Sequence, residues 1–157
     1  MSVTTGIGWD VHRLADGRAL ILGGVRIEHD RGLLGHSDAD VLTHAVMDAL
    51  LGAAGLGDIG EHFPDSDPRF EGADSLALLR HVVGLLEGRP VLHVDATVLM
   101  ERPKLAPHKP AIRAALAEAL GIAEEHVNVK ATTGERMGFV GREEGVAALA
   151  VATLGAA

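Results

Sequence analysis

Two short stretches of the sequence, residues 8–13 and 36–44, together contain three histidines and three aspartates. Within them, Asp10, His12 and His44 offer two imidazoles and one carboxylate. Such a set holds Zn²⁺ or a similar divalent ion in three positions and leaves a fourth for water or substrate. The residue types do not distinguish zinc from manganese or cobalt. We therefore expect a divalent metal site built from these two stretches.

Other residues suit phosphate groups better than a transition metal. His36 precedes an expected helix start at Ser37, where backbone N–H groups attract anions, so it is better placed to donate to phosphate than to serve as a fourth ligand. Residues 132–135, Thr-Thr-Gly-Glu, follow an expected strand. Hydroxyl groups there can hold phosphate oxygens, and Glu135 suits a second, harder ion such as Mg²⁺. Lys104 stands in a proline-rich connection, where it either faces a phosphate or is simply solvated.

The segment before the first stretch is β-prone over residues 3–9. In an extended chain Asp10 and His12 point to the same side, because side chains alternate with a period of two. Taken alone, the pair also fits an exposed strand end with two solvated side chains. The interpretation as a metal site therefore depends on His44, the third ligand, which the second stretch supplies.

The second stretch leads into a predicted helix. Ser37 followed by Asp40 three residues later has the form of an N-cap with an acidic N3 residue, so we expect a helix from there to about Ala54. His44 falls on the same side as Asp40 and Asp48, spaced four apart and opposite the apolar side. This pattern predicts that His44 lies on a polar face and is not a core histidine.

The remaining elements follow from apolar periodicity and from glycine and proline positions. Residues 55–70 show no period and are expected to be a functional or flexible loop. The other expected elements are a hairpin at 19–22 and 25–28 around Gly23-Gly24, a loop at 30–35, helices at 75–86 and 111–120, and strands at 91–100, 127–133 and 145–154. This order predicts an α/β (α+β) fold, with a single mixed sheet and helices packed on one face.

Composition limits the classes of protein to consider. The 157 residues carry a net charge of −8 and contain no cysteine, which excludes thiolate metal sites and cysteine nucleophiles. The negative charge and the absence of a basic cluster argue against nucleic-acid binding. No apolar run reaches the length of a membrane span, and no leader pattern is seen. We expect one domain over residues 1–157, located in the cytoplasm and not bound to membrane.

Five motifs in the same order resemble the 2-C-methyl-D-erythritol 2,4-cyclodiphosphate synthase family of the non-mevalonate isoprene biosynthesis pathway, over nearly the whole chain. They are Gly8-x-Asp10-x-His12-Arg13, residues 35–40 with His44, Gly57-Asp58-Ile59-Gly60 with Phe63-Pro64-Asp65, Pro103-Lys104-Leu105, and residues 130–135 with Gly138-Phe139-x-Gly141-Arg142. The resemblance implies a lyase that cyclises 4-diphosphocytidyl-2-C-methyl-D-erythritol 2-phosphate and releases CMP. It also implies a homotrimer with active sites between subunits.

The resemblance further implies roles for individual residues. Asp10, His12 and His44 would bind zinc, and Glu135 would bind Mg²⁺ or Mn²⁺ with the diphosphate. His36 and Thr133 would stabilise the transition state. The substrate-binding residues would be Ser37, Asp58, Gly60, Phe63, Asp65, Met100, Lys104, Leu105, Ala106, Thr132, Phe139 and Arg142. Of these, the last two would lie near the trimer axis, where the family has a cavity suited to a hydrophobic ligand that bears a diphosphate.

The sequence departs from the family pattern at two places. Gly134 stands where a third threonine is common, and Met100-Glu101-Arg102 stands where smaller residues often occur. Two other functions also fit the residues. A metal-dependent phosphohydrolase would use similar histidine and aspartate ligands to activate water, and a metal-binding or nucleotide-binding module would need no turnover.

Overall fold

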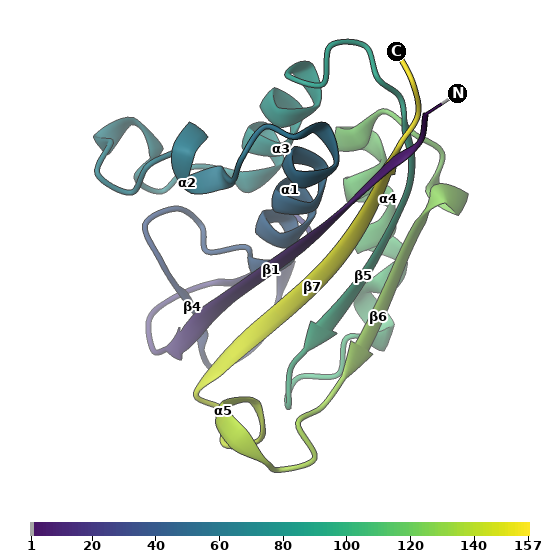
Figure 1. The fold of residues 1–157 in the computed structure, drawn as a ribbon. Coiled ribbons are helices and arrows are strands. Elements are labelled where there is room, and N and C mark those ends of the chain that lie inside the picture. The colour runs from purple at the N-terminus through teal and green to yellow at the C-terminus, as the bar shows by residue number, and fades with distance from the viewer. Residues whose placement is uncertain (1) are drawn as a thin grey trace.

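The computed structural model describes residues 2–157, in which a five-stranded mixed sheet is covered by helices on one face (Figure 1). The strand order is β4-β1-β7-β5-β6, and only the β5–β6 pair is parallel. The strands are β1 (Thr4–Ala15), β4 (Gly32–Leu34), β5 (Val91–Leu99), β6 (Val127–Thr132) and β7 (Gly145–Leu154). The mixed sheet that the sequence predicts is therefore confirmed.

The longer helices lie in one layer behind the sheet (Figure 1). The α-helices are α1 (Val41–Ala54), α2 (Ile59–His62), α3 (Ser75–Gly84), α4 (Lys109–Leu120) and α5 (Gly138–Gly141), and the short 3₁₀ helices are η1 (Pro68–Phe70), η2 (Ala106–His108) and η3 (Glu124–His126). Helix α1 packs on β1 and β7, α3 packs on α1, and α4 packs between α3 and β6. None of the helices in residues 2–157 is long and apolar enough to cross a membrane.

Two glycines set how closely α1 approaches the sheet. A Cβ atom at Gly8 would lie 1.8 Å from the carbonyl oxygen of Ala45, and one at Gly6 would lie 2.1 Å from that of Ala49. The backbone of α1 therefore lies directly against β1, which no larger residue at these positions would permit. Because β1 alternates, the face that carries these glycines also carries Asp10 and His12. This contact brings α1 beside them.

The start of α1 differs from the prediction. Asp40, not Ser37, is the N-cap, and its carboxylate accepts from Thr43 N and from the backbone N–H groups of Gly23 and Gly24. One buried carboxylate thus caps the helix and holds the turn between β2 (Leu20–Leu22) and β3 (Val25–Ile27). These two strands form a separate two-stranded sheet, so the prediction of a single sheet is wrong for the hairpin.

The polar face predicted for α1 is present, but it is buried. His44 is only 7% exposed and Asp40 is fully buried, because β1, the hairpin and α3 surround this helix. Helical periodicity separates polar from apolar sides, but it does not show which sides are solvent-exposed. The polar side of α1 faces other polar groups inside the protein.

Other boundaries differ where tertiary contacts extend or interrupt an element. Strand β1 continues to Ala15 because it pairs along its length with β7 and then with β4, a strand inside the expected loop 30–35. The segment 55–70 contains α2 and η1, each started by an aspartate cap. Strand β7 has the predicted bounds, and α4 ends at Leu120 as predicted but begins at Lys109, two residues before the predicted start.

Candidate active site

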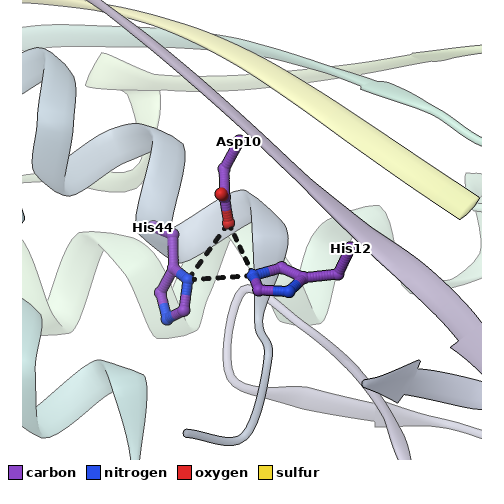
Figure 2. Close-up of side chains that lie close together, drawn as sticks. All are labelled: Asp10, His12 and His44. Atoms are coloured by element: carbon purple, nitrogen blue, oxygen red, sulfur yellow. Dashed lines mark hydrogen bonds and ion pairs between the residues drawn. The ribbon is translucent and has the colours of Figure 1, made fainter. Parts of the chain in front are cut away.

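Asp10, His12 and His44 converge as the sequence predicts (Figure 2). The Oδ2 atom of Asp10 lies 2.9 Å from His12 Nε2 and 3.1 Å from His44 Nδ1, and the two nitrogens are 3.4 Å apart. Ligands about 2.0–2.1 Å from a tetrahedral zinc ion are roughly 3.3 Å apart. The three atoms therefore fit one face of such a tetrahedron. Within residues 2–157 this is the one group of at least three histidine, aspartate or glutamate side chains close enough to share an ion.

Further contacts orient both imidazoles. His12 Nδ1 lies 3.0 Å from the carbonyl oxygen of Leu34, which can only accept, so this nitrogen carries the proton and Nε2 is free to act as a ligand. His44 Nε2 lies 2.9 Å from Ser75 Oγ and 3.2 Å from Ser37 Oγ. In both imidazoles, the nitrogen that points away from the metal position therefore has a polar partner.

The charges within the group favour an ionised Asp10 and a protonated His44. Burial alone would raise the pKa of Asp10, but hydrogen bonds and positive charge from His12 and His44 outweigh it and lower the pKa from 3.8 to about 2. Burial works against the charged form of His44, yet the hydrogen bond and the charge of Asp10 raise the pKa of the imidazole above 6.5. Asp10 is thus ionised at neutral pH, ready to bind a cation.

A cavity of about 470 Å³ opens beside the three side chains. Five of the expected phosphate-binding and substrate-binding residues line it together with the metal group: His36, Ser37, Gly60, Phe63 and Asp65. Asp58 does not line the cavity. Its carboxylate caps α2, which carries Gly60. His36 Nε2 lies 3.1 Å from the carbonyl oxygen of Asp67 and so joins the segment 55–70 to the site.

A second group of expected residues lies elsewhere. Met100, Lys104, Leu105, Ala106, Thr132 and Thr133 line a separate cavity of about 210 Å³ at the ends of β5 and β6. Among residues 2–157, none lines both cavities. In the strand order, β7 separates β1, which carries Asp10 and His12, from β5 and β6. The structure of one chain therefore divides the expected active-site residues into two groups.

Three further expected residues lie beyond the carboxyl end of β6. Glu135 is exposed and is not part of the metal group. Phe139 lines a third cavity, of about 220 Å³, together with His12 and Arg13. The guanidinium of Arg142 pairs with Glu144 at 2.8 Å.

The two departures from the family pattern contact each other. The carboxylate of Glu101 accepts from the backbone N–H groups of Gly134 (2.8 Å) and Arg136 (3.2 Å). A Cβ atom at Gly134 would lie 2.7 Å from the backbone nitrogen of Gly141. In this chain the turn after Thr133 is held by Glu101 and leaves no room for the hydroxyl-bearing side chain that is common there.

Two residues of the site region were missed by sequence reasoning. Ser75 was expected only as the first residue of a helix, but it is fully buried against His44. Arg18 donates to the carbonyl oxygens of Leu33, Gly35 and Ser37 and so holds the segment that carries His36. No local pattern indicates either contact, because each joins segments far apart in the chain.

Comparison with known proteins finds relatives over nearly the whole chain. The YgbB family model matches residues 3–155. Proteins from Pseudomonas aeruginosa and Ralstonia pickettii, both named 2-C-methyl-D-erythritol 2,4-cyclodiphosphate synthase, are each 62% identical to the chain. The alignments cover 95% and 96% of this chain and 96% and 91% of those proteins.

Solved structures with the same fold include two related enzymes. A 2C-methyl-D-erythritol-2,4-cyclodiphosphate synthase in a CDP-bound form is 39% identical, with a TM-score of 0.87 over 96% of this chain and 99% of that one. The bifunctional IspDF from Campylobacter jejuni is 44% identical, with a TM-score of 0.94 over 98% of this chain. The present chain spans 42% of that longer protein.

Proposed function

This chain belongs to the YgbB family, and on that basis we propose that it catalyses the reaction for which its relatives are named, the synthesis of 2-C-methyl-D-erythritol 2,4-cyclodiphosphate. It is an enzyme of isoprenoid biosynthesis, a cyclising lyase that releases CMP from a diphosphocytidyl substrate. The observation that carries the proposal is the Asp10-His12-His44 group beside a cavity lined by His36 and Ser37.

The reaction needs no protein nucleophile. An oxygen of the substrate's 2-phosphate attacks the β-phosphorus, the bond from that phosphorus to the bridging oxygen breaks, and CMP leaves with the electron pair. The protein contributes position and charge stabilisation. His36 and Ser37 donate to phosphate oxygens in the larger cavity, and Thr133 does so from the smaller one. Asp58, at the N-terminus of α2, contacts the erythritol hydroxyls together with Gly60.

The donor set supports a bound divalent ion. We assign Asp10, His12 and His44 as the ligands of Zn²⁺ or a similar metal, on the fit of their three atoms to a tetrahedral face. When bound, such an ion supplies positive charge to the phosphate oxygens. Glu135 is assigned to a second ion, Mg²⁺ or Mn²⁺, that arrives with the diphosphate.

A homotrimer would join the two groups of site residues. The face of the sheet opposite the helices exposes Ile7 (70%), Trp9 (47%), Val11 (43%) and Val151 (40%), and Ile7 is directly opposite Val151 in the β1–β7 pair. An apolar strip of this kind is typical of an interface between protein chains. We propose that three copies pack through this face, so that the smaller cavity of one chain faces the larger cavity of the next and holds the cytidine diphosphate.

An assay of products tests the function. The purified protein, incubated with 4-diphosphocytidyl-2-C-methyl-D-erythritol 2-phosphate and Mg²⁺, should release CMP and an equal amount of the cyclic diphosphate. Replacing His36 with Ala should slow this release, because it removes a donor to the phosphate. Release of inorganic phosphate in place of the cyclic product would favour the phosphohydrolase alternative, which none of the relatives reported above supports.

A further inference from the structure

Behind the metal ligands lies a buried polar chain that reaches from His44 to the start of α3. His44 Nε2, the nitrogen turned away from Asp10, is 2.9 Å from the hydroxyl oxygen of Ser75. That hydroxyl in turn donates a short hydrogen bond to Asp38. Ser75 has no solvent-exposed surface, so water does not compete for either contact.

The direction of each hydrogen bond follows from which of the groups carry a proton to donate. Asp38 accepts from three donors, namely the backbone N–H groups of Ser75 (2.9 Å) and Asp40 (3.1 Å) and the Ser75 hydroxyl. A carboxylate has no proton to give, so the single hydroxyl proton of Ser75 is committed to Asp38. The oxygen of Ser75 then faces His44 with its lone pairs only. It can accept a hydrogen bond from the imidazole but cannot donate one.

The consequence for His44 is a defined tautomer. If Nε2 carried a lone pair, it would face the lone pairs of Ser75 at 2.9 Å inside the protein, which is unfavourable, and would be left with the more distant hydroxyl of Ser37, at 3.2 Å, as a donor. With a proton on Nε2 the contact becomes a hydrogen bond. Nδ1 is then the nitrogen that faces Asp10 and His12: without an ion it donates to Asp10, and with an ion bound it presents its lone pair as a ligand.

We propose that Ser75 and Asp38 are positioning residues of the metal site, which hold His44 with Nε2 protonated and Nδ1 turned to the ion. This inference rests on the proposed metal site. Neither residue touches the substrate or the ion, and both act through His44.

The same residues connect the metal site to the end of the segment 55–74. The backbone N–H of Gly72 donates to His36 O at 2.8 Å, and that of Asp38 donates to Ala73 O at 3.1 Å. Together with the bonds from Ser75 to Asp38, these contacts hold the segment before α3 against the residues that carry the phosphate donors. The orientation of His44 and the position of that segment therefore depend on one hydrogen-bonded junction.

The test compares Ser75→Ala with a matched control. Zinc alone is titrated into each metal-free protein at one fixed pH, in competition with a chelating dye. Loss of a partner behind a metal-binding histidine typically weakens binding about 10–100-fold, and we expect this for Ser75→Ala. Thr43→Val is the control: it also removes a fully buried hydroxyl, one that donates to Asp40 and not to the chain behind His44. We expect it to leave the affinity unchanged.

Nitrogen-15 NMR of the zinc-loaded wild-type protein provides a readout that requires no variant. His44 should show a proton on Nε2 that exchanges slowly with water, and Ser75→Ala should speed this exchange. Equal zinc affinity in wild type and Ser75→Ala would overturn the inference while leaving the metal site and the CMP-release assay unaffected. A proton on Nδ1 of the zinc-loaded protein would overturn both the inference and the assignment of Nδ1 as a metal ligand. A wild-type protein that binds no zinc would overturn both the inference and the metal assignment.

Discussion

Asp48 illustrates how single side chains around the site are influenced by burial and by neighbouring charge. Its carboxylate is half-buried on α1 and accepts from the backbone N–H of Ile59 at 2.8 Å, which anchors α2. Burial, followed by the nearby carboxylates of Asp58 and Asp10, raises the pKa of Asp48 above 3.8. The folded state therefore binds this proton more tightly than the unfolded state does.

The sign of the pH dependence follows from that shift. A raised carboxyl pKa contributes stability that is present below pH 3.8 and is lost as the pH rises through the folded-state pKa. At neutral pH the ionised Asp48 therefore destabilises the fold. Asp48→Asn keeps the oxygen that accepts from Ile59 and removes the charge. We expect a higher melting temperature at neutral pH and a gain that shrinks toward pH 3.8.

Thermal unfolding across this pH range, with a chelator present, measures the effect. The exposed residue Asp16 provides the control, because Asp16→Asn should change the melting temperature little at any pH. A lower melting temperature for Asp48→Asn at neutral pH, or a gain that does not vary with pH, would contradict the prediction.

At the scale of elements, the decisive contact is the one between β1 and α1. Gly8→Ala would place a Cβ atom 1.8 Å from the carbonyl oxygen of Ala45, so the helix would have to move away from the strand. Because His44 precedes Ala45, this movement separates it from Asp10. We expect zinc binding to be lost and the free energy of unfolding to fall by about 1–3 kcal/mol, as for other overpacked cores.

Gly52, on the same helix, is the matched control. A Cβ atom there would lie 3.7 Å from its nearest neighbour, in ordinary contact, and the residue is exposed. Gly52→Ala should therefore stabilise the helix by about 0.5–1 kcal/mol and leave zinc binding unchanged. Denaturant unfolding and zinc titration of both variants check the pair. Intact zinc binding in Gly8→Ala would show that the close approach does not position His44.

At the scale of the whole molecule, the face of the sheet opposite the helices is the surface through which we propose that three copies pack. Ile7→Lys changes a side chain that is 70% exposed in the single chain, so it should not disturb the core. If three copies pack through this face, the substitution buries a charge in the interface. We expect sedimentation to show monomers, with CMP release lost and zinc binding retained.

Glu118→Lys is the control for assembly. This residue is exposed on α4, on the helix side of the molecule. The Glu118→Lys variant should sediment like the wild type and keep its activity. A wild-type protein that sediments as a monomer and still releases CMP would rule out the shared site.

Residue types, alternation and capping patterns in the sequence were sufficient to predict several features. They placed Asp10 and His12 on one side of a strand, identified the strand 145–154 and the C-terminal end of α4, and selected the ligand types for a metal. These features depend on neighbours within a few residues, where backbone geometry is set by local sterics and hydrogen bonding.

Only the tertiary structure decided the surroundings of those residues. It buried His44, made Asp40 the cap of both a helix and a hairpin, placed Ser75 behind the metal ligand, and divided the site residues between two cavities. Each of these contacts joins segments far apart in the chain. Periodicity shows which side of a helix is polar, but packing determines whether that side meets water or another polar group.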